Sequence, residues 1–204
     1  MTSVTSAVKE LFSVVGDLSA LFEADGLRFV HSEGRLPFGW VWHLGRKKTR
    51  ALYRPVTNLI AIGAEGDPLP ALAHEWGHWL DYRALDTNLT ACSCYGLPEM
   101  HTLLVQAAGS MDQVFELLPH EMCPTEIWAR LVAQYVYREL CAMKGLRPAF
   151  LCAGERYASG AGYWSEGAWQ ELQPGVVEAI QGRLSDMAGR LSVSLERGVV
   201  LWQG

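Results

Sequence analysis

His74-Glu75-Trp76-Gly77-His78 is the stretch of this 204-residue sequence that decides its fold and indicates its chemistry. Two histidines four positions apart in a helix lie one turn above each other, so both imidazoles can face a single ion. Glu75 follows the first histidine and lies about 100° further round the helix. From there its carboxylate could accept a proton from a water molecule that the ion activates. The pentapeptide is therefore typical of zinc-dependent peptide hydrolysis.

The residues around the pentapeptide predict that it lies in a buried helix over residues 70–82. One flank of this helix is apolar and consists of Leu72, Ala73, Trp76, Trp79 and Leu80. His74, His78 and Asp81 lie together on the other side. Gly77 costs about 1 kcal/mol relative to alanine in a helix interior, which indicates that another segment packs closely against it. The alternative is a surface helix that carries two histidines by chance.

A catalytic zinc ion usually has three protein ligands and a fourth position for water, so one more donor is required. The downstream candidates are His101, His120, Glu121, Cys123 and Glu126. Metzincins place a third histidine six residues after the second, but that position is Ala84 here. We favour Glu126, because Pro124 and Thr125 suit the start of a helix whose first turn could present this carboxylate to the ion. Alternatively, Glu126 only complements the positive end of that helix, a contribution of about 0.3–1 kcal/mol.

Two separated motifs resemble the zincin-like domain of large polyvalent proteins of phages and plasmids, which is itself similar to minimal gluzincin peptidases. The first motif runs from Tyr53 to Ile62 and continues, after a short gap, from Leu72 to Asp81. The second is Pro124-Thr-Glu-Ile-Trp-Ala-Arg130, which matches the P-x-E-x-x-A-R segment of that family. The resemblance covers roughly residues 50–82 and 124–140, with a fainter similarity around residues 157–173. Their order along the chain agrees with the order in the family.

The resemblance implies that His74, His78 and Glu126 hold one zinc ion and that Glu75 is the catalytic general base. It also implies a phage or plasmid protein that acts on a protein or peptide substrate as a metallopeptidase. Trp79 departs from the family, which more often carries a small residue there, and this implies a different packing of the neighbouring elements.

The oxyanion formed during peptide hydrolysis needs a hydrogen-bond donor from outside the HEWGH motif. The candidate donors are Tyr157, Tyr163, His120 and Arg130, and the sequence does not rank them. Asp81 lies three residues beyond His78, which is too far along the helix to reach the ion easily. A hydrogen bond that supports a ligand, or a contact near the end of the helix, suits Asp81 better.

Two other functions compete with peptide hydrolysis. The first is a zinc-binding recognition or interaction module of a mobile genetic element, with little or no proteolytic activity. Glu75 argues against this module, because a purely structural zinc site has no use for a base beside an open metal position. The second is a helical interaction domain that exposes aromatic side chains and binds no metal.

Composition predicts an ordinary globular protein, since 50% of the residues are hydrophobic and 19% are charged. The net charge of −5 argues against nucleic acid as a partner. The basic run from Arg46 to Arg50 is interpreted as a hairpin turn, or alternatively as a contact for an acidic partner. Five cysteines without a secretory leader or membrane-spanning segment favour the cytoplasm and exclude a membrane partner. Cys92-Ser-Cys94 also allows the hypothesis of a second metal site.

The predicted elements place the chain in the α+β class, with a small mixed or antiparallel sheet packed on the HEWGH helix and further C-terminal helices, as in zincin-like folds. We expect one domain over residues 1–204: an N-terminal helix in 1–26, the sheet and HEWGH helix in 27–82, and a mainly helical part with the third ligand in 83–204. Strands are predicted at 27–30, 40–44, 51–53 and 58–62. Further helices are predicted at 6–24, 99–118, 124–144 and 174–191. The strand at 58–62, or its neighbour, is expected to border the cleft and to pair with an extended substrate.

Overall fold

Short strands near the N-terminus are followed by longer helices in the computed structural model, which describes residues 4–32, 51–63, 68–83, 91, 93, 98–111, 123–145 and 164–192. The elements are α1 (Val4–Val15), α2 (Ser19–Asp25), β1 (Arg28–Ser32), β2 (Ala51–Arg54), the 3-10 turn η2 (Pro55–Thr57), β3 (Leu59–Gly63), α3 (Pro68–Arg83), α4 (Pro98–Ser110), α5 (Pro124–Met143) and α7 (Glu166–Arg190). A small mixed sheet packs against α3, and further helices follow, so the predicted α+β class is confirmed.

The three described strands form a sheet in the order β1-β3-β2, with β1 parallel and β2 antiparallel to β3. Tyr53 pairs with Ile60 and Ala51 pairs with Ile62, so these four buried residues share the face that joins the main core. Strand β3 has a partner on each side. The predicted substrate strand at 58–62 therefore has no open edge, and among the described strands its two neighbours, β1 and β2, form the edges of the sheet.

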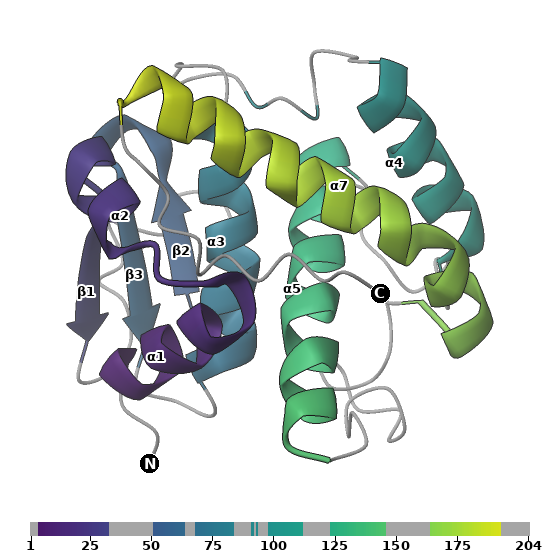
Figure 1. The fold of residues 1–204 in the computed structure, drawn as a ribbon, viewed down its shortest axis with the longest axis horizontal. Helices are drawn as coiled ribbons and strands as arrows, with labels where there is room; N and C mark the ends of the chain where they lie inside the picture. Colours follow the sequence, from purple (N-terminus) through teal and green to yellow (C-terminus); the bar gives the residue numbers. More distant parts are fainter. Residues whose placement is uncertain are drawn as a thin grey trace.

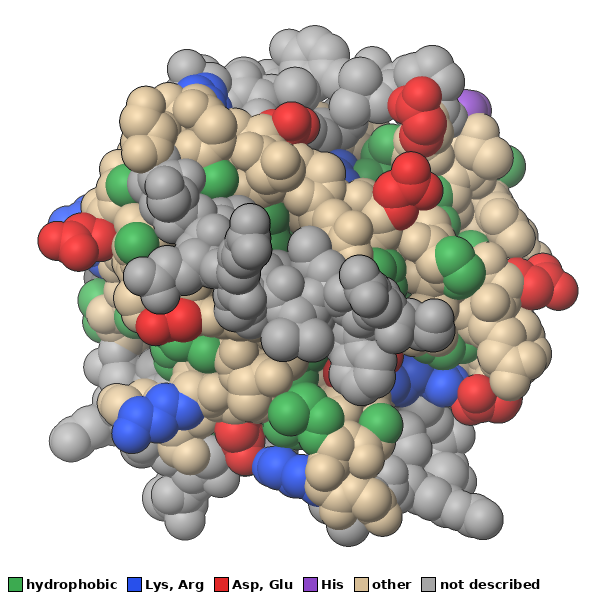
Figure 2. Space-filling view, in the orientation of Figure 1, with side chains coloured by type: hydrophobic (Ala, Val, Ile, Leu, Met, Phe, Trp, Pro, Cys, Tyr) green, Lys and Arg blue, Asp and Glu red, His purple; other side chains and the backbone are tan. Residues whose placement is uncertain are grey.

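Figure 1 shows how the helices are arranged around this sheet. Helix α3 lies beside β2, and α5 lies next to α3. Helix α7 runs across α3 and α5 and reaches α4 at its other end. No described helix is long and apolar enough to cross a membrane. On the face drawn in Figure 2, the visible acidic and basic side chains are interspersed.

The N-terminal helix predicted at 6–24 is wrong as a single element, because the chain forms α1 and α2 with a break between them. Gly16 adopts a φ of +87°, a left-handed conformation that a helix interior does not contain. The Asp17 carboxylate then accepts a hydrogen bond from the Ser19 amide at 2.8 Å, at the start of α2. Helix α2 ends at Asp25-Gly26, as predicted.

The last described helix begins at Glu166 rather than at Pro174, which lies inside α7. Its start is held by tertiary contacts, because the Gln134 side chain accepts from the Trp164 amide and donates to the Trp164 carbonyl, both at 3.0 Å. The Trp164 indole also donates to the Ala107 carbonyl at 2.7 Å. A proline removes one helical hydrogen bond, and α7 tolerates this loss where it packs on α4 and α5.

The remaining predicted helices agree with the structure within the described residues. Helix α3 covers the predicted 70–82, and α5 matches the predicted helix that contains Glu126. Helix α4 spans Pro98–Ser110 and so covers the first part of the helix predicted at 99–118. Several predicted features lie outside the described residues: the strand at 40–44, the basic run at 46–50, Cys92, Cys94 and residues 112–118 of the α4 prediction.

Trp79 anchors α3 to the N-terminal part of the fold. Its indole is completely buried, stacks edge-on against Phe22 at 5.0 Å, and donates to the Asp25 carboxylate at 2.8 Å. Asp25 also accepts from both Nε and Nη2 of Arg83 and from the Asn58 amide group at 2.7 Å. One buried carboxylate thus joins α2, α3 and the turn before β3.

Candidate metal centre

The site is built where α3 and α5 cross at very short range. A Cβ atom added to Gly77 would lie 2.9 Å from the Ala129 Cα and 3.1 Å from the Val132 Cβ. The Trp128 indole donates to the Gly77 carbonyl at 3.0 Å, which links the two helices directly. The close packing predicted from Gly77 is confirmed. Only a residue without a side chain allows the two backbones to approach so closely.

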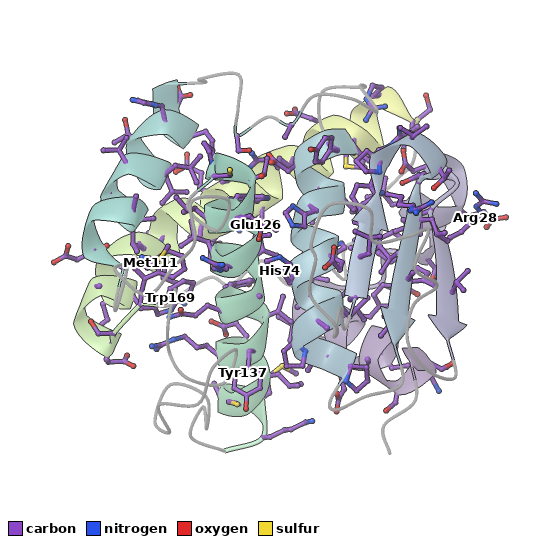
Figure 3. The ribbon with its side chains drawn as sticks, turned by 180° about the vertical axis from the view of Figure 1, so that it is seen from behind. Arg28, His74, Met111, Glu126, Tyr137 and Trp169 are labelled. Atoms are coloured by element: carbon purple, nitrogen blue, oxygen red, sulfur yellow. The ribbon has the colours of Figure 1, made fainter. Side chains whose placement is uncertain are left out.

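This crossing brings His74 and His78 of α3 together with Glu126 from the first turn of α5. The His74 Nε2 lies 3.3 Å from Glu126 Oε2, and the His78 Nε2 lies 3.4 Å from Glu126 Oε1. The two imidazole rings are 4.8 Å apart and nearly perpendicular, at 86°. Figure 3 shows His74 and Glu126 close together between the two helices. Within the described residues, these three side chains form one group that could hold a metal ion.

The spacing of the three side chains is short enough for one metal ion. Zinc–nitrogen and zinc–oxygen bonds of about 2.0–2.2 Å at tetrahedral angles place neighbouring ligand atoms about 3.4 Å apart. The His74 distance of 3.3 Å to Oε2 and the His78 distance of 3.4 Å to Oε1 are close to this separation, each for a different carboxylate oxygen, and one ligand atom of each residue lies within 4.8 Å of the others. Both nitrogen–oxygen distances are longer than the usual range of N–H···O hydrogen bonds, which is about 2.7–3.2 Å. Two nitrogen donors and one carboxylate also suit zinc chemically.

Burial and charge favour a cation between these side chains. The His74 side chain is 7% exposed, whereas the Glu126 side chain is 29% exposed, so the group is buried on the α3 side and meets solvent beside Glu126. Burial lowers the pKa of His78, but pairing with Glu126 and the charges of Glu75 and Asp81 outweigh it and raise this pKa. Burial raises the pKa of Glu126, but the two imidazoles hold it well below its usual value. Positive charge is therefore stabilised at this position.

Glu75 lies in the same helix but outside the group of three, and it contacts the edge of the sheet. Its Oε2 atom accepts a hydrogen bond of 2.6 Å from the Tyr53 amide of β2, and the residue is buried. This bond holds one carboxylate oxygen of Glu75 at the backbone of β2, and the charge of Glu75 still acts on His78. Sequence reasoning missed Tyr53 as a partner of Glu75, because a backbone amide leaves no signal in the choice of residue.

The other predicted site residues have different positions. His101 and Cys123 are exposed and do not join the metal group. Arg130 is buried one helical turn beyond Glu126. The candidates His120, Glu121, Tyr157 and Tyr163 lie outside the described residues.

Asp81 is completely buried and does not join the metal group either. It accepts from the Ser93 amide at 2.9 Å, from the Ser93 hydroxyl at 2.5 Å and from Arg183 Nη2 at 3.2 Å. Burial raises the pKa of Asp81, and the opposing effects of Arg183 and Ser93 do not cancel this shift. Sequence reasoning missed Arg183. The sequence signal that could have identified Arg183 is the presence of a charged residue on the apolar face of α7, between Ile180 and Met187.

Comparisons of the chain with protein-family models, with curated proteins and with solved structures give no match. What is known of the site thus comes from its geometry, which shows two histidines and a glutamate that could hold a metal ion.

Proposed function

We propose that the protein is a zinc-dependent metallopeptidase in which His74, His78 and Glu126 hold the ion and Glu75 is the general base. The observation that carries this proposal is the convergence of two imidazoles and one carboxylate at ligand distances, next to a second, separately anchored carboxylate. The resemblance of the HEWGH and P-x-E-x-x-A-R motifs to minimal gluzincins supports the same roles. A structural zinc site would use a fourth protein ligand instead of a neighbouring base.

A bound zinc ion would supply a water molecule of lowered pKa and would polarise the scissile carbonyl group. His74 and His78 must be neutral to act as ligands, and Glu126 must be ionised. The Tyr53 amide holds Glu75 Oε2, and Oε1 is the oxygen that would accept the proton of the attacking water. Glu75 then delivers this proton to the leaving nitrogen.

The edge of β2 is the proposed support for an extended peptide substrate. In an antiparallel ladder, the amide and carbonyl of one residue point to the same side. The Tyr53 amide points away from β3 towards Glu75, so the Tyr53 carbonyl points to the same side. A peptide that donates its own N–H to this carbonyl would lie beside the general base.

The variant Glu75→Gln tests the catalytic role. Glutamine keeps the volume and can still accept the Tyr53 hydrogen bond, but it does not accept the proton of water. We expect Glu75→Gln to bind zinc like the wild type and to lose cleavage of a diverse peptide mixture by about 100-fold or more. His74→Ala is the matched control and should lose both zinc and cleavage. Equal cleavage by wild type and Glu75→Gln would refute the mechanism.

Cleavage must be distinguished from binding without turnover. Peptide ends can be compared by mass spectrometry between cells that express the wild type and cells that express Glu75→Gln. New peptide ends in the wild type alone would support hydrolysis. Stoichiometric zinc in both proteins with identical peptide ends would instead favour the zinc-binding recognition module.

A further inference from the structure

Arg183 is a buried cation that contacts both of the helices that carry the metal group, although its own helix carries neither motif. It lies on α7 and is 6% exposed. Its Nη2 atom donates to the Asp81 carboxylate of α3 at 3.2 Å. Its guanidinium carbon lies 4.0 Å from the centre of the Trp128 ring of α5. A guanidinium that pairs with a carboxylate on one helix and stacks on an indole of another helix holds these two helices at a defined separation.

These contacts form a closed path that we call the three-helix linkage, made of Gly77, Trp128, Arg183 and Asp81. The Trp128 indole donates to the Gly77 carbonyl of α3, Arg183 stacks on the Trp128 ring, and Arg183 returns to α3 at Asp81. The path therefore begins and ends on the helix that carries both histidines. Each of its steps joins two different helices, except for the return along α3 itself.

The three-helix linkage adjoins the metal group on both helices. Gly77 directly precedes His78, and Trp128 lies two residues beyond Glu126. Two residues of helix correspond to a rise of about 3 Å, so a displacement of Trp128 is passed to Glu126 almost undiminished. Metal ligands must keep their distances within about 0.2 Å, so a small movement of α5 along α3 would weaken the site.

We propose that Arg183 is a positioning residue for the metal centre, acting through Trp128 to set the place of Glu126 relative to the two histidines. The inference rests on the proposed function in one respect, namely that these three residues bind zinc. It adds that α7, which supplies no ligand of the metal group, determines how tightly the ion is held. Asp81 takes part as the acceptor that orients Arg183. The amide and the hydroxyl of Ser93 also donate hydrogen bonds to the Asp81 carboxylate.

Arg138 provides a matched control within the same pair of helices. It lies on α5, pairs with the Glu166 carboxylate of α7 at 2.7 Å, and lies 5.4 Å from the centre of the Trp169 ring of α7. Arg138 makes the same two kinds of contact as Arg183, although its partner Glu166 is 69% exposed whereas Asp81 is completely buried. It lies about three helical turns, or roughly 18 Å, further along α5 than Glu126. Its loss should weaken the contact between α5 and α7 without moving the metal ligands.

The test compares Arg183→Met and Arg138→Met with the wild type in two measurements on the full chain. The first is the zinc dissociation constant, obtained by competition with a chromophoric chelator. The second is the free energy of unfolding of the metal-free protein in urea. We expect Arg183→Met to weaken zinc binding by about tenfold or more, as for other groups that support metal ligands. We expect Arg138→Met to change it by less than about threefold, whatever its effect on stability.

The absorption spectrum of the cobalt-substituted protein gives a readout that a merely structural role would not change. Displacement of Glu126 in Arg183→Met should alter the intensity of the cobalt bands, whereas Arg138→Met should keep the wild-type spectrum. If Arg183→Met does not fold, Arg183→Lys replaces it, because lysine keeps the charge but loses the planar stack on Trp128. This variant should then show the weaker zinc binding and the altered spectrum.

The outcomes separate the two proposals. A wild-type protein that binds no zinc would refute the proposed function, and the positioning role with it. If the wild type binds zinc and the Arg183 variants match it in affinity and cobalt spectrum, the positioning role alone is refuted. It is also refuted if Arg138→Met weakens zinc binding as much as Arg183→Met does.

Discussion

Replacing Gly77 by alanine should weaken the metal site by pushing α5 away from α3. The new Cβ would lie 2.9 Å from the Ala129 Cα, while ordinary contacts begin near 3.4 Å, so the helices must separate by about 0.5 Å. Overpacking of this kind costs about 1–3 kcal/mol, and the better helix propensity of alanine returns about 1 kcal/mol. The free energy of unfolding should therefore fall by up to about 2 kcal/mol. Because 0.5 Å exceeds the tolerance of metal ligands, about 0.2 Å, zinc affinity should fall as well.

The assay combines urea unfolding of the metal-free protein with zinc competition, and Gly182→Ala is the matched control. Gly182 lies inside α7, and an added Cβ would meet nothing within 4 Å. Alanine there should stabilise the protein by about 0.5–1 kcal/mol and leave zinc affinity unchanged. The reasoning would be refuted if Gly77→Ala were as stable as Gly182→Ala and bound zinc as tightly as the wild type.

Two further predictions concern pH and a buried carboxylate. In the metal-free protein, the raised pKa of His78 adds stability that is complete below pH 6.5 and is lost as the pH rises through its folded pKa. The lowered pKa of Glu126 adds stability above pH 4.5 that is lost as the pH falls. Urea unfolding of the metal-free protein should thus show the greatest stability between pH 4.5 and pH 6.5. Saturating zinc should move the pH of greatest stability upwards, because the ligand imidazoles must be neutral. Identical pH profiles with and without zinc would contradict this. Asp25→Ala should lower the free energy of unfolding by about 3–5 kcal/mol in the same assay, since it leaves Arg83 and the Trp79 indole without their shared buried acceptor. A loss below about 1 kcal/mol would show that Asp25 does not join the helices.

The sequence predicts the elements of the site well because their signals are local. Periodic apolar residues define α3, and Pro124-Thr125 marks the start of α5. Gly77 predicts that another segment packs closely on α3, and in the structure this segment is α5. Each of these signals depends only on residues within one or two turns of a helix, where spacing determines direction.

The features that the sequence does not predict depend on tertiary contacts. Helix α7 begins before Pro174 because Gln134 of α5 binds the backbone of Trp164, a contact that leaves no periodic pattern in the sequence. Glu75 is oriented by a backbone amide, which every residue except proline possesses. Arg183 and Asp81 are distant in the sequence and meet only because α7 crosses α3.

X-ray absorption at the zinc edge of the loaded protein is the most direct measurement of the ligand set. Our account predicts one ion with two imidazole nitrogens and further oxygen neighbours at about 2.0–2.2 Å, and loss of an oxygen neighbour or of the ion itself in Glu126→Ala. A sulfur neighbour at about 2.3 Å, or a spectrum that is identical in Glu126→Ala, would contradict it.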